Sequence, residues 1–204
     1  IKDLKLKIDK EIGLRTNDLI SLIGVFELNG KLMYMTDPSV IPYPTLEEKV
    51  HLINNAVKFA ISTGLTNPKV AVVTAIGVAN PRMPETLEAE ELMEMNKRDE
   101  IKNCIVDGPL SLDLAVSPES VRIKNSKRRI NGDADILLFP EVHSANIAYK
   151  TLTHLGDLKS GNIIIGTRQP VILSSRGDSV DVKLNSIILG FIYDWRLTLF
   201  NLAF

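Results

Sequence analysis

The stretch Pro170–Ile187, which reads PVILSSRGDSVDVKLNSI, is the part of the sequence that decides the fold. Its apolar, β-branched start, Val171–Leu173, predicts a buried strand. The polar segment Ser174–Ser179 follows and predicts a tight loop. Apolar residues then recur at the spacing of one helix face, at Val180, Leu184, Ile187 and Phe191. We therefore expect a buried strand that feeds a helix through a short polar turn.

The polar loop has the composition of an anion site. A helix start presents unpaired backbone N–H groups and the positive end of the helix dipole. Arg176 adds a planar guanidinium, which matches the geometry of a phosphate group. An ordinary turn prefers the same residues, with Asp178 or Ser179 as the helix N-cap and Arg176 in a surface ion pair. On pattern alone, a phosphate site and a plain turn both remain open.

Composition narrows the protein class. The chain has 204 residues, 45% of them hydrophobic and 24% charged, with a net charge of −1, which is ordinary for a soluble globular protein. The balanced charge argues against a nucleic-acid surface. A single cysteine, Cys104, and three scattered histidines exclude an internal disulfide framework and show no metal-binding spacing. We expect no metal and no nucleic-acid partner, and a cytoplasmic location.

The two ends do not read as targeting or membrane segments. Residues 1–11 are too charged for the apolar part of a signal peptide, and Ile1–Ile12 has the spacing of a helix. The apolar segment Ile187–Phe204 is interrupted by Asp194 and Arg196, so we expect a core or dimer-contact helix and no membrane contact. The chain begins with Ile1 and not with Met, as a fragment of a longer protein would.

The rest of the chain alternates strand and helix patterns. Leu19–Leu28 and Lys31–Met35 predict a hairpin around Asn29-Gly30, and the T-x-x-E motif at Thr45 predicts the start of a helix that runs to Gly64. Further strands are predicted at Lys69–Ile76, Asn103–Val106, Ala134–Phe139 and Gly161–Ile165, and further helices at Glu85–Asn96, Leu110–Val116 and Ser144–Leu155. This order predicts an α/β fold in which helices cover a mainly parallel sheet. Ligands of such folds bind beyond the carboxyl ends of the strands.

Two segments leave alternatives open. The proline-rich segment Asp37–Thr45 is the candidate boundary between residues 1–44, which include the hairpin, and residues 45–204, which carry the parallel portion. A basic cluster precedes Gly132 and consists of Lys124, Lys127, Arg128 and Arg129. Such a cluster is either a solvated face or a landing site for a polyphosphate ligand.

Several loops together resemble one enzyme family. The motifs are VDGPLSLD at Val106–Asp113, GDADILLFP at Gly132–Pro140, ANIAYK at Ala145–Lys150, SRGDSVDVKLNSI at Ser175–Ile187, TDP with PTLEEK within Thr36–Lys49, and GLR at Gly13–Arg15. Their order and spacing over nearly the whole chain resemble the phosphate acetyltransferase and phosphate butyryltransferase family. The DGPL and KLNSI segments are closer to the butyryl, or branched-acyl, branch.

The resemblance implies a reversible reaction, in which an acyl group passes between coenzyme A and orthophosphate by direct attack in a ternary complex. It implies a two-domain, three-layer fold related to isocitrate and isopropylmalate dehydrogenases, a homodimer, and no cofactor, with coenzyme A as a substrate. The resemblance assigns residues 45–204 to the phosphate- and acyl-CoA-binding portion. The family's usual chain is longer, and we expect its N-terminal part to be missing here. The alternatives are transfer of an acetyl group, or a catalytically incomplete α/β module that binds phosphate or coenzyme A.

The resemblance also assigns roles to residues of the opening stretch. Ser175 becomes the donor to the developing oxyanion, and Arg176 becomes the clamp for phosphate. Asp181 is our first candidate for the carboxylate that takes the thiol proton, and Asp178 is the second. The better-known acetyl enzymes of the family carry their aspartate one position further from the serine, where this chain has Val182. Each aspartate could instead only cap or complement the helix.

Other candidate residues lie outside that stretch. Asn146 and Lys150 belong to a segment that resembles the family signature AGNxxYK, although the usual glycine is absent. Asn146 could orient phosphate or hold a loop, and Lys150 is a candidate for substrate binding. Arg15 could reach the phosphate from the other domain or be an exposed arginine at a helix end. Asp107 is expected to fix the Gly108-Pro109 turn.

Overall fold

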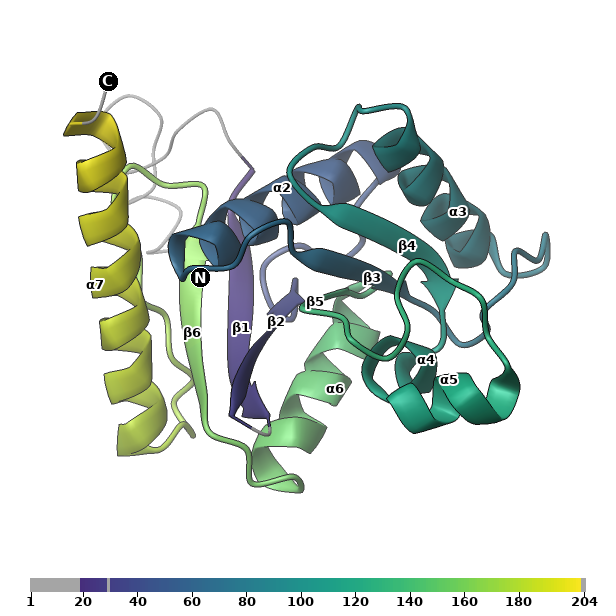
Figure 1. Cartoon of the computed structure of the whole chain (residues 1–204). Coiled ribbons are helices and arrows are strands. Elements are labelled where there is room, and N and C mark those ends of the chain that lie inside the picture. The colour runs from purple at the N-terminus through teal and green to yellow at the C-terminus, as the bar shows by residue number, and fades with distance from the viewer. Residues whose placement is uncertain (1–18, 29, 203–204) are drawn as a thin grey trace.

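One six-stranded sheet forms the middle of three layers (Figure 1). The computed structural model describes residues 19–28 and 30–202. The expected helix Ile1–Ile12 and the candidate Arg15 lie outside these residues. The strands are β1 (Ser21–Leu28), β2 (Lys31–Thr36), β3 (Lys69–Val73), β4 (Ile105–Leu110), β5 (Ile136–Leu138) and β6 (Ser160–Ile165), and their order in the sheet is β4-β3-β5-β2-β1-β6. Only β1 runs against its neighbours among these six strands, which confirms a mainly parallel sheet.

Helices cover both faces of the sheet, and each covered face holds its own apolar cluster. The helices α2 (Leu46–Ser62), α3 (Pro84–Lys97) and α7 (Val180–Leu202) pack on one side, and α4 (Leu112–Val116), α5 (Pro118–Lys124) and α6 (Val142–His154) pack on the other (Figure 1). The layered α/β fold is therefore confirmed. The hairpin β1–β2 lies in the same sheet as β3–β6, and the division of the chain at residue 44 stays a prediction.

Two locally encoded elements form as predicted. Leu28 pairs with Lys31 across the hairpin turn, and Gly30 has a φ angle of 76°, which favours glycine. Helix α2 begins with a complete capping box: Thr45 Oγ1 accepts the Glu48 N–H at 3.2 Å, and Glu48 Oε2 accepts the Thr45 N–H at 2.8 Å. The turn of the hairpin and the start of the helix are both determined by contacts between residues at most three positions apart.

The predicted turn at Asp107-Gly108-Pro109 is wrong, because these residues continue strand β4 to Leu110. The Asp107 carboxylate instead accepts the backbone N–H groups of Arg129 at 2.7 Å and Ile130 at 3.0 Å, and it pairs with Arg128 at 3.0 Å. It therefore fixes the segment that leads into β5.

The basic cluster before Gly132 is largely used in such internal contacts. Besides the Arg128 pair, Arg129 Nη1 donates to Asn96 Oδ1 at 2.9 Å, and Lys124 pairs with Asp113 at 2.6 Å. Because these side chains already have partners within the chain, the contacts argue against a landing site for a polyphosphate ligand.

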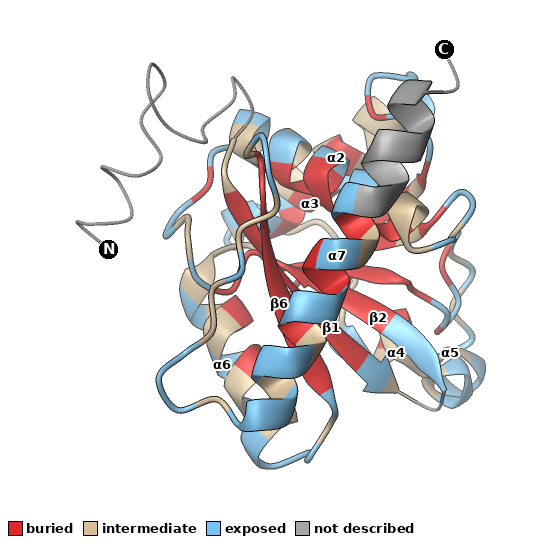
Figure 2. Cartoon of the chain, turned by 90° about the vertical axis from the view of Figure 1, so that its left-hand side faces the viewer, coloured by how far each residue is buried: buried red, intermediate tan, exposed pale blue. Residues whose placement is uncertain are grey.

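The buried strand predicted at Val171–Leu173 is also wrong. Only an isolated bridge joins Val171 to Ile164, and Ile172 is 41% exposed. The helix that follows turns its expected apolar face to solvent, with Phe191 71% exposed (Figure 2). The opposite face, which carries Ser186, Leu189 and Tyr193, is buried.

The close packing of α7 on β6 explains this orientation. A Cβ added at Gly161 would lie 2.8 Å from Leu189 Cδ1 and 3.2 Å from the backbone carbonyl carbon of Asn185, so glycine is what lets the helix approach. Ser186 Oγ accepts the Asn162 N–H at 2.8 Å, and Asn185 Nδ2 donates to the Ser160 carbonyl at 3.0 Å. Polar side chains of α7 thus satisfy backbone groups of β6. None of the helices in the described ranges is both long and apolar enough to cross a membrane.

Candidate functional site

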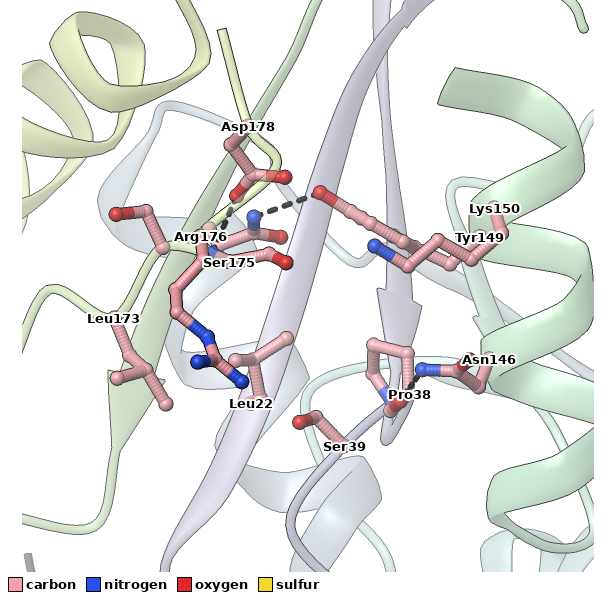
Figure 3. Close-up of a pocket in the computed structure, with 12 residues that line it drawn as sticks. Leu22, Pro38, Ser39, Asn146, Tyr149, Lys150, Leu173, Ser175, Arg176 and Asp178 are labelled. Atoms are coloured by element: carbon pink, nitrogen blue, oxygen red, sulfur yellow. Dashed lines mark hydrogen bonds between the residues drawn. The ribbon is translucent and has the colours of Figure 1, made fainter. Parts of the chain in front are cut away.

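A cavity of about 340 Å³ lies beside the loop that precedes α7 (Figure 3). Its walls come from the start of β1, the loop after β2, helix α6, strand β6 and the loop before α7. The lining residues are Leu22, Pro38, Ser39, Asn146, Tyr149, Lys150, Asn162, Leu173, Ser174, Ser175, Arg176 and Asp178. Five residues that the sequence singled out therefore meet in one place: Ser175, Arg176, Asp178, Asn146 and Lys150.

The loop before α7 is closed by Asp178. Its Oδ2 accepts the Ser175 N–H at 2.6 Å, and its own N–H donates to the Ser175 carbonyl at 3.1 Å. This double contact fixes Ser175 and Asp178 at adjacent positions of the cavity wall. Arg176 extends from the same loop and makes no ion pair with any residue of the described ranges (Figure 3). Its charge is therefore available to a ligand.

Helix α6 supplies the facing wall. Its start is capped by Glu141, whose carboxylate accepts the N–H groups of His143 at 2.6 Å and Ser144 at 2.9 Å. Asn146 Nδ2 donates to the Pro38 carbonyl at 2.9 Å, so the Asn146 amide holds the loop after β2. One turn later, Lys150 Nζ lies 5.5 Å from the centre of the Tyr149 ring and brings a second positive charge to the cavity.

Two further lining residues, Tyr149 and Asn162, have no role assigned from the sequence alone. Both are buried, at 5% and 4% exposure, and Asn162 Nδ2 donates to the Tyr149 hydroxyl at 2.7 Å. Burial raises the pKa of Tyr149, the Asn162 hydrogen bond opposes this shift, and the Asp178 charge adds to it. The Tyr149 hydroxyl is therefore a neutral donor near pH 7. Asn162 lies inside an apolar strand, where no local motif marks it.

Asp181 does not line this cavity. It is exposed in the first turn of α7 and lines a neighbouring cavity of about 540 Å³ with His154, Asp157 and Lys159. Asp178 lines both cavities. Of the two candidate carboxylates, Asp178 is the one that shares a wall with Ser175. Within the described ranges, no group of three or more His, Cys, Asp or Glu residues is placed to hold a metal ion.

A family model and similar curated proteins all point to phosphate acetyl- and butyryltransferases. The family model described as phosphate acetyl/butaryl transferase matches residues 3–191. A phosphate butyryltransferase of Clostridium acetobutylicum is 46% identical over 92% of this chain and 63% of its own length, and a phosphate acetyltransferase of Thermotoga maritima is 43% identical over 93% of this chain and 65% of its own. The chain thus spans a little under two thirds of these relatives.

Solved structures extend the comparison to the fold. A branched-chain phosphotransacylase from Enterococcus faecalis V583 superimposes with a TM-score of 0.87 at 36% identity, over 93% of this chain and 68% of that one. A 4-hydroxythreonine-4-phosphate dehydrogenase from Klebsiella pneumoniae shares the fold with a TM-score of 0.51 at 15% identity, over 85% of this chain and 54% of that one. The expected relation to a dehydrogenase-like fold is confirmed at this level.

Proposed function

This chain belongs to the phosphate acetyl/butaryl transferase family, and we propose that it transfers acyl groups reversibly between coenzyme A and orthophosphate. The observation that carries the proposal is that Ser175, Arg176 and Asp178 line one cavity, where Arg176 has no ion pair with a described residue. We favour butyryl-CoA or a branched acyl-CoA as the substrate, because butyryl relatives and a branched-chain phosphotransacylase are among the similar proteins.

The cavity offers the groups that a direct transfer needs. When acyl phosphate reacts with coenzyme A, a C–S bond forms, the thiol proton passes to a carboxylate, and the C–O bond to phosphate breaks. We assign the carboxylate to Asp178, since its Oδ1 accepts no hydrogen bond from a residue of the described ranges. Ser175 donates to the carbonyl oxygen as negative charge develops there. Arg176 holds the phosphate that leaves with the bonding electrons.

The partners follow from the same proposal. Coenzyme A enters as a substrate, and the reaction uses no further cofactor. We place the protein in the cytoplasm, where acyl-CoA is available.

A homodimer is supported by the exposed apolar face of α7, whose residues are Val180, Leu184, Ile187, Ile188 and Phe191. Light scattering on the purified chain measures the oligomeric state directly, and a monomer at working concentration would remove the dimer from this proposal.

The decisive experiment follows release of coenzyme A from butyryl-CoA with a thiol reagent, with and without phosphate. Cys104 does not disturb this assay while the protein is folded, because burial raises the pKa of its thiol to about 11. We expect release that requires phosphate. Arg176→Ala is expected to raise the KM for phosphate roughly 10- to 100-fold, as for a lost hydrogen bond to a charged group. Arg168→Ala is the matched control, because Arg168 is exposed and does not line the cavity.

Three results of this assay would favour a function other than butyryl or branched-acyl transfer. Equal release without phosphate would identify a thioesterase-like hydrolysis and reject the transferase. A preference for acetyl-CoA would favour the acetyl alternative, which the Thermotoga relative supports. No release, with phosphate still bound in calorimetry, would favour the incomplete binding module.

A further inference from the structure

The Tyr149 hydroxyl has an unused hydrogen at the wall of the proposed site. Its oxygen accepts a hydrogen bond from Asn162 Nδ2 at 2.7 Å, and an amide NH₂ group can only donate. That bond uses the oxygen and not the phenolic hydrogen, which has no acceptor within hydrogen-bond distance among the described residues, although the buried Ser160 hydroxyl also lowers the pKa of Tyr149. The residue is 5% exposed and lines the cavity that also contains Arg176 and Lys150. A buried donor at a cavity wall is best satisfied by an acceptor atom in the cavity.

A chain of hydrogen bonds fixes this hydroxyl relative to helix α7. Ser186 Oγ donates to the Val182 carbonyl at 2.7 Å and accepts the Asn162 N–H at 2.8 Å, and the Asn162 side chain then donates to Tyr149. This series of hydrogen bonds joins α7, β6 and α6, and the bond from Asn185 Nδ2 to the Ser160 carbonyl also joins α7 to β6. It holds the Tyr149 hydroxyl opposite the loop that carries Ser175 and Arg176 (Figure 3).

Asn162 is oriented toward Tyr149 at a cost. Its Oδ1 is buried and has no hydrogen-bond partner among the residues of the described ranges. Leaving a buried acceptor unpaired destabilises a fold, so an apolar residue would serve better if packing were the only requirement. An amide nevertheless stands at this position, and its one side-chain bond among the described residues is to the Tyr149 hydroxyl. Polarisation by such a donor strengthens the hydroxyl as a donor in turn.

The charges around the hydroxyl select the acceptor. Lys150 Nζ lies 5.5 Å from the Tyr149 ring centre, and Arg176 lines the same cavity without an ion pair to a described residue. The Asp178 carboxylate adds one negative charge to the same cavity, so two cations and one anion leave the site net positive, which favours an oxyanion as the acceptor. We propose that the Tyr149 hydroxyl donates to an oxygen of bound phosphate and that Asn162 is the positioning residue that fixes it there. The inference rests on the proposed function, whose phosphate is the ligand.

The test uses calorimetry of inorganic phosphate binding to the full chain. Tyr149→Phe keeps the ring, which packs 5.4 Å from Phe26, and removes only the hydroxyl. We expect its Kd for phosphate to rise roughly tenfold or more, as for a lost hydrogen bond to a charged group. Tyr34→Phe is the matched control, because it deletes a buried hydroxyl bonded to Thr63 Oγ1 at 2.6 Å outside the cavity. Its Kd is expected to stay within twofold of the wild type.

A double-variant cycle tests the positioning role. Asn162→Ala is expected to weaken phosphate binding several-fold in the wild type and to add nothing to Tyr149→Phe, because it acts through the hydroxyl. A full additional loss in the double variant would overturn the positioning role. Unchanged phosphate Kd in Tyr149→Phe, with a shifted pH profile of kcat, would assign the hydroxyl to the Asp178 carboxylate and overturn the phosphate contact.

Different results would reject the Tyr149 contact and the proposed transferase function. If the wild type releases coenzyme A only with phosphate and Tyr149→Phe leaves the KM and Kd for phosphate unchanged, this inference alone is rejected. If the wild type neither binds phosphate nor requires it, the proposed function is rejected, and the Tyr149 contact with it.

Discussion

Asp178 and Ser175 are hydrogen-bonded to each other in both directions across the loop before α7. The Asp178 carboxylate accepts the Ser175 N–H at 2.6 Å, and the Asp178 N–H donates to the Ser175 carbonyl at 3.1 Å. One carboxylate oxygen therefore shapes the loop, while the other receives no hydrogen bond from a described residue. A single side chain can thus hold Ser175 in place and still take a proton.

We predict that Asp178→Asn lowers kcat roughly 100-fold or more, as for the loss of a general base. The asparagine side chain can still accept the Ser175 N–H, so the loop is expected to survive. Asp181→Asn is the matched control, because Asp181 lies in the neighbouring cavity. Steady-state kinetics in both directions of the reaction measure the effect. The reverse ranking of the two variants would move the base to Asp181.

Ser175→Ala is expected to lower kcat on the order of 100-fold, the usual effect of removing one oxyanion donor. The KM for phosphate is expected to change little, because Arg176 remains. Ser174→Ala, the same change one position earlier on the same cavity wall, serves as the control. An unchanged rate in Ser175→Ala would make Ser175 only a turn residue.

Asp37 predicts a pH dependence of stability. Its carboxylate is buried and accepts the N–H groups of Ser39 at 2.8 Å, Val40 at 2.9 Å and Ile41 at 3.3 Å, and burial raises its pKa from 3.8 to about 6. The folded chain therefore binds this proton more tightly than the unfolded chain does. The stability that the proton contributes is complete below about pH 4 and is lost as the pH rises through 6.

Urea denaturation of the wild type and Asp37→Asn between about pH 4 and pH 7 measures this contribution. The difference in the free energy of unfolding, wild type minus variant, is expected to fall by at most about 3 kcal/mol over that range. Other titrating groups are common to both proteins and cancel. A difference that does not vary with pH would contradict the raised pKa.

Gly161→Ala is expected to destabilise the fold by about 1–3 kcal/mol, the usual cost of overpacking. The added methyl would meet Leu189 Cδ1 at 2.8 Å and the Asn185 backbone at 3.2 Å, which pushes α7 away from β6. Gly77→Ala is the control, since its Cβ would make only an ordinary contact at 3.4 Å. Equal denaturation midpoints for the two variants would show that α7 is not held closely to β6.

Much of the fold could be predicted because its signals are local. The hairpin at Gly30 and the capping box at Thr45 depend on neighbours in sequence, and the alternation of strands and helices gave the layered architecture. The wrong turn at Asp107 has a tertiary cause. Asp107 was assigned to a turn by its neighbours, whereas its hydrogen-bond partners are Arg129 and Ile130, more than twenty positions away.

The sequence by itself determined the family, the mainly parallel α/β fold and the choice of Ser175 and Arg176 as site residues. Motifs and periodicity are properties of residues close together in the chain, so they can be recognised without a structure. The tertiary structure decided which residues join Ser175 and Arg176. It brought Asp178 and not Asp181 to the cavity and added Tyr149 and Asn162 from two other elements. The physical reason is that periodicity shows which residues share a face, but only packing decides what that face meets.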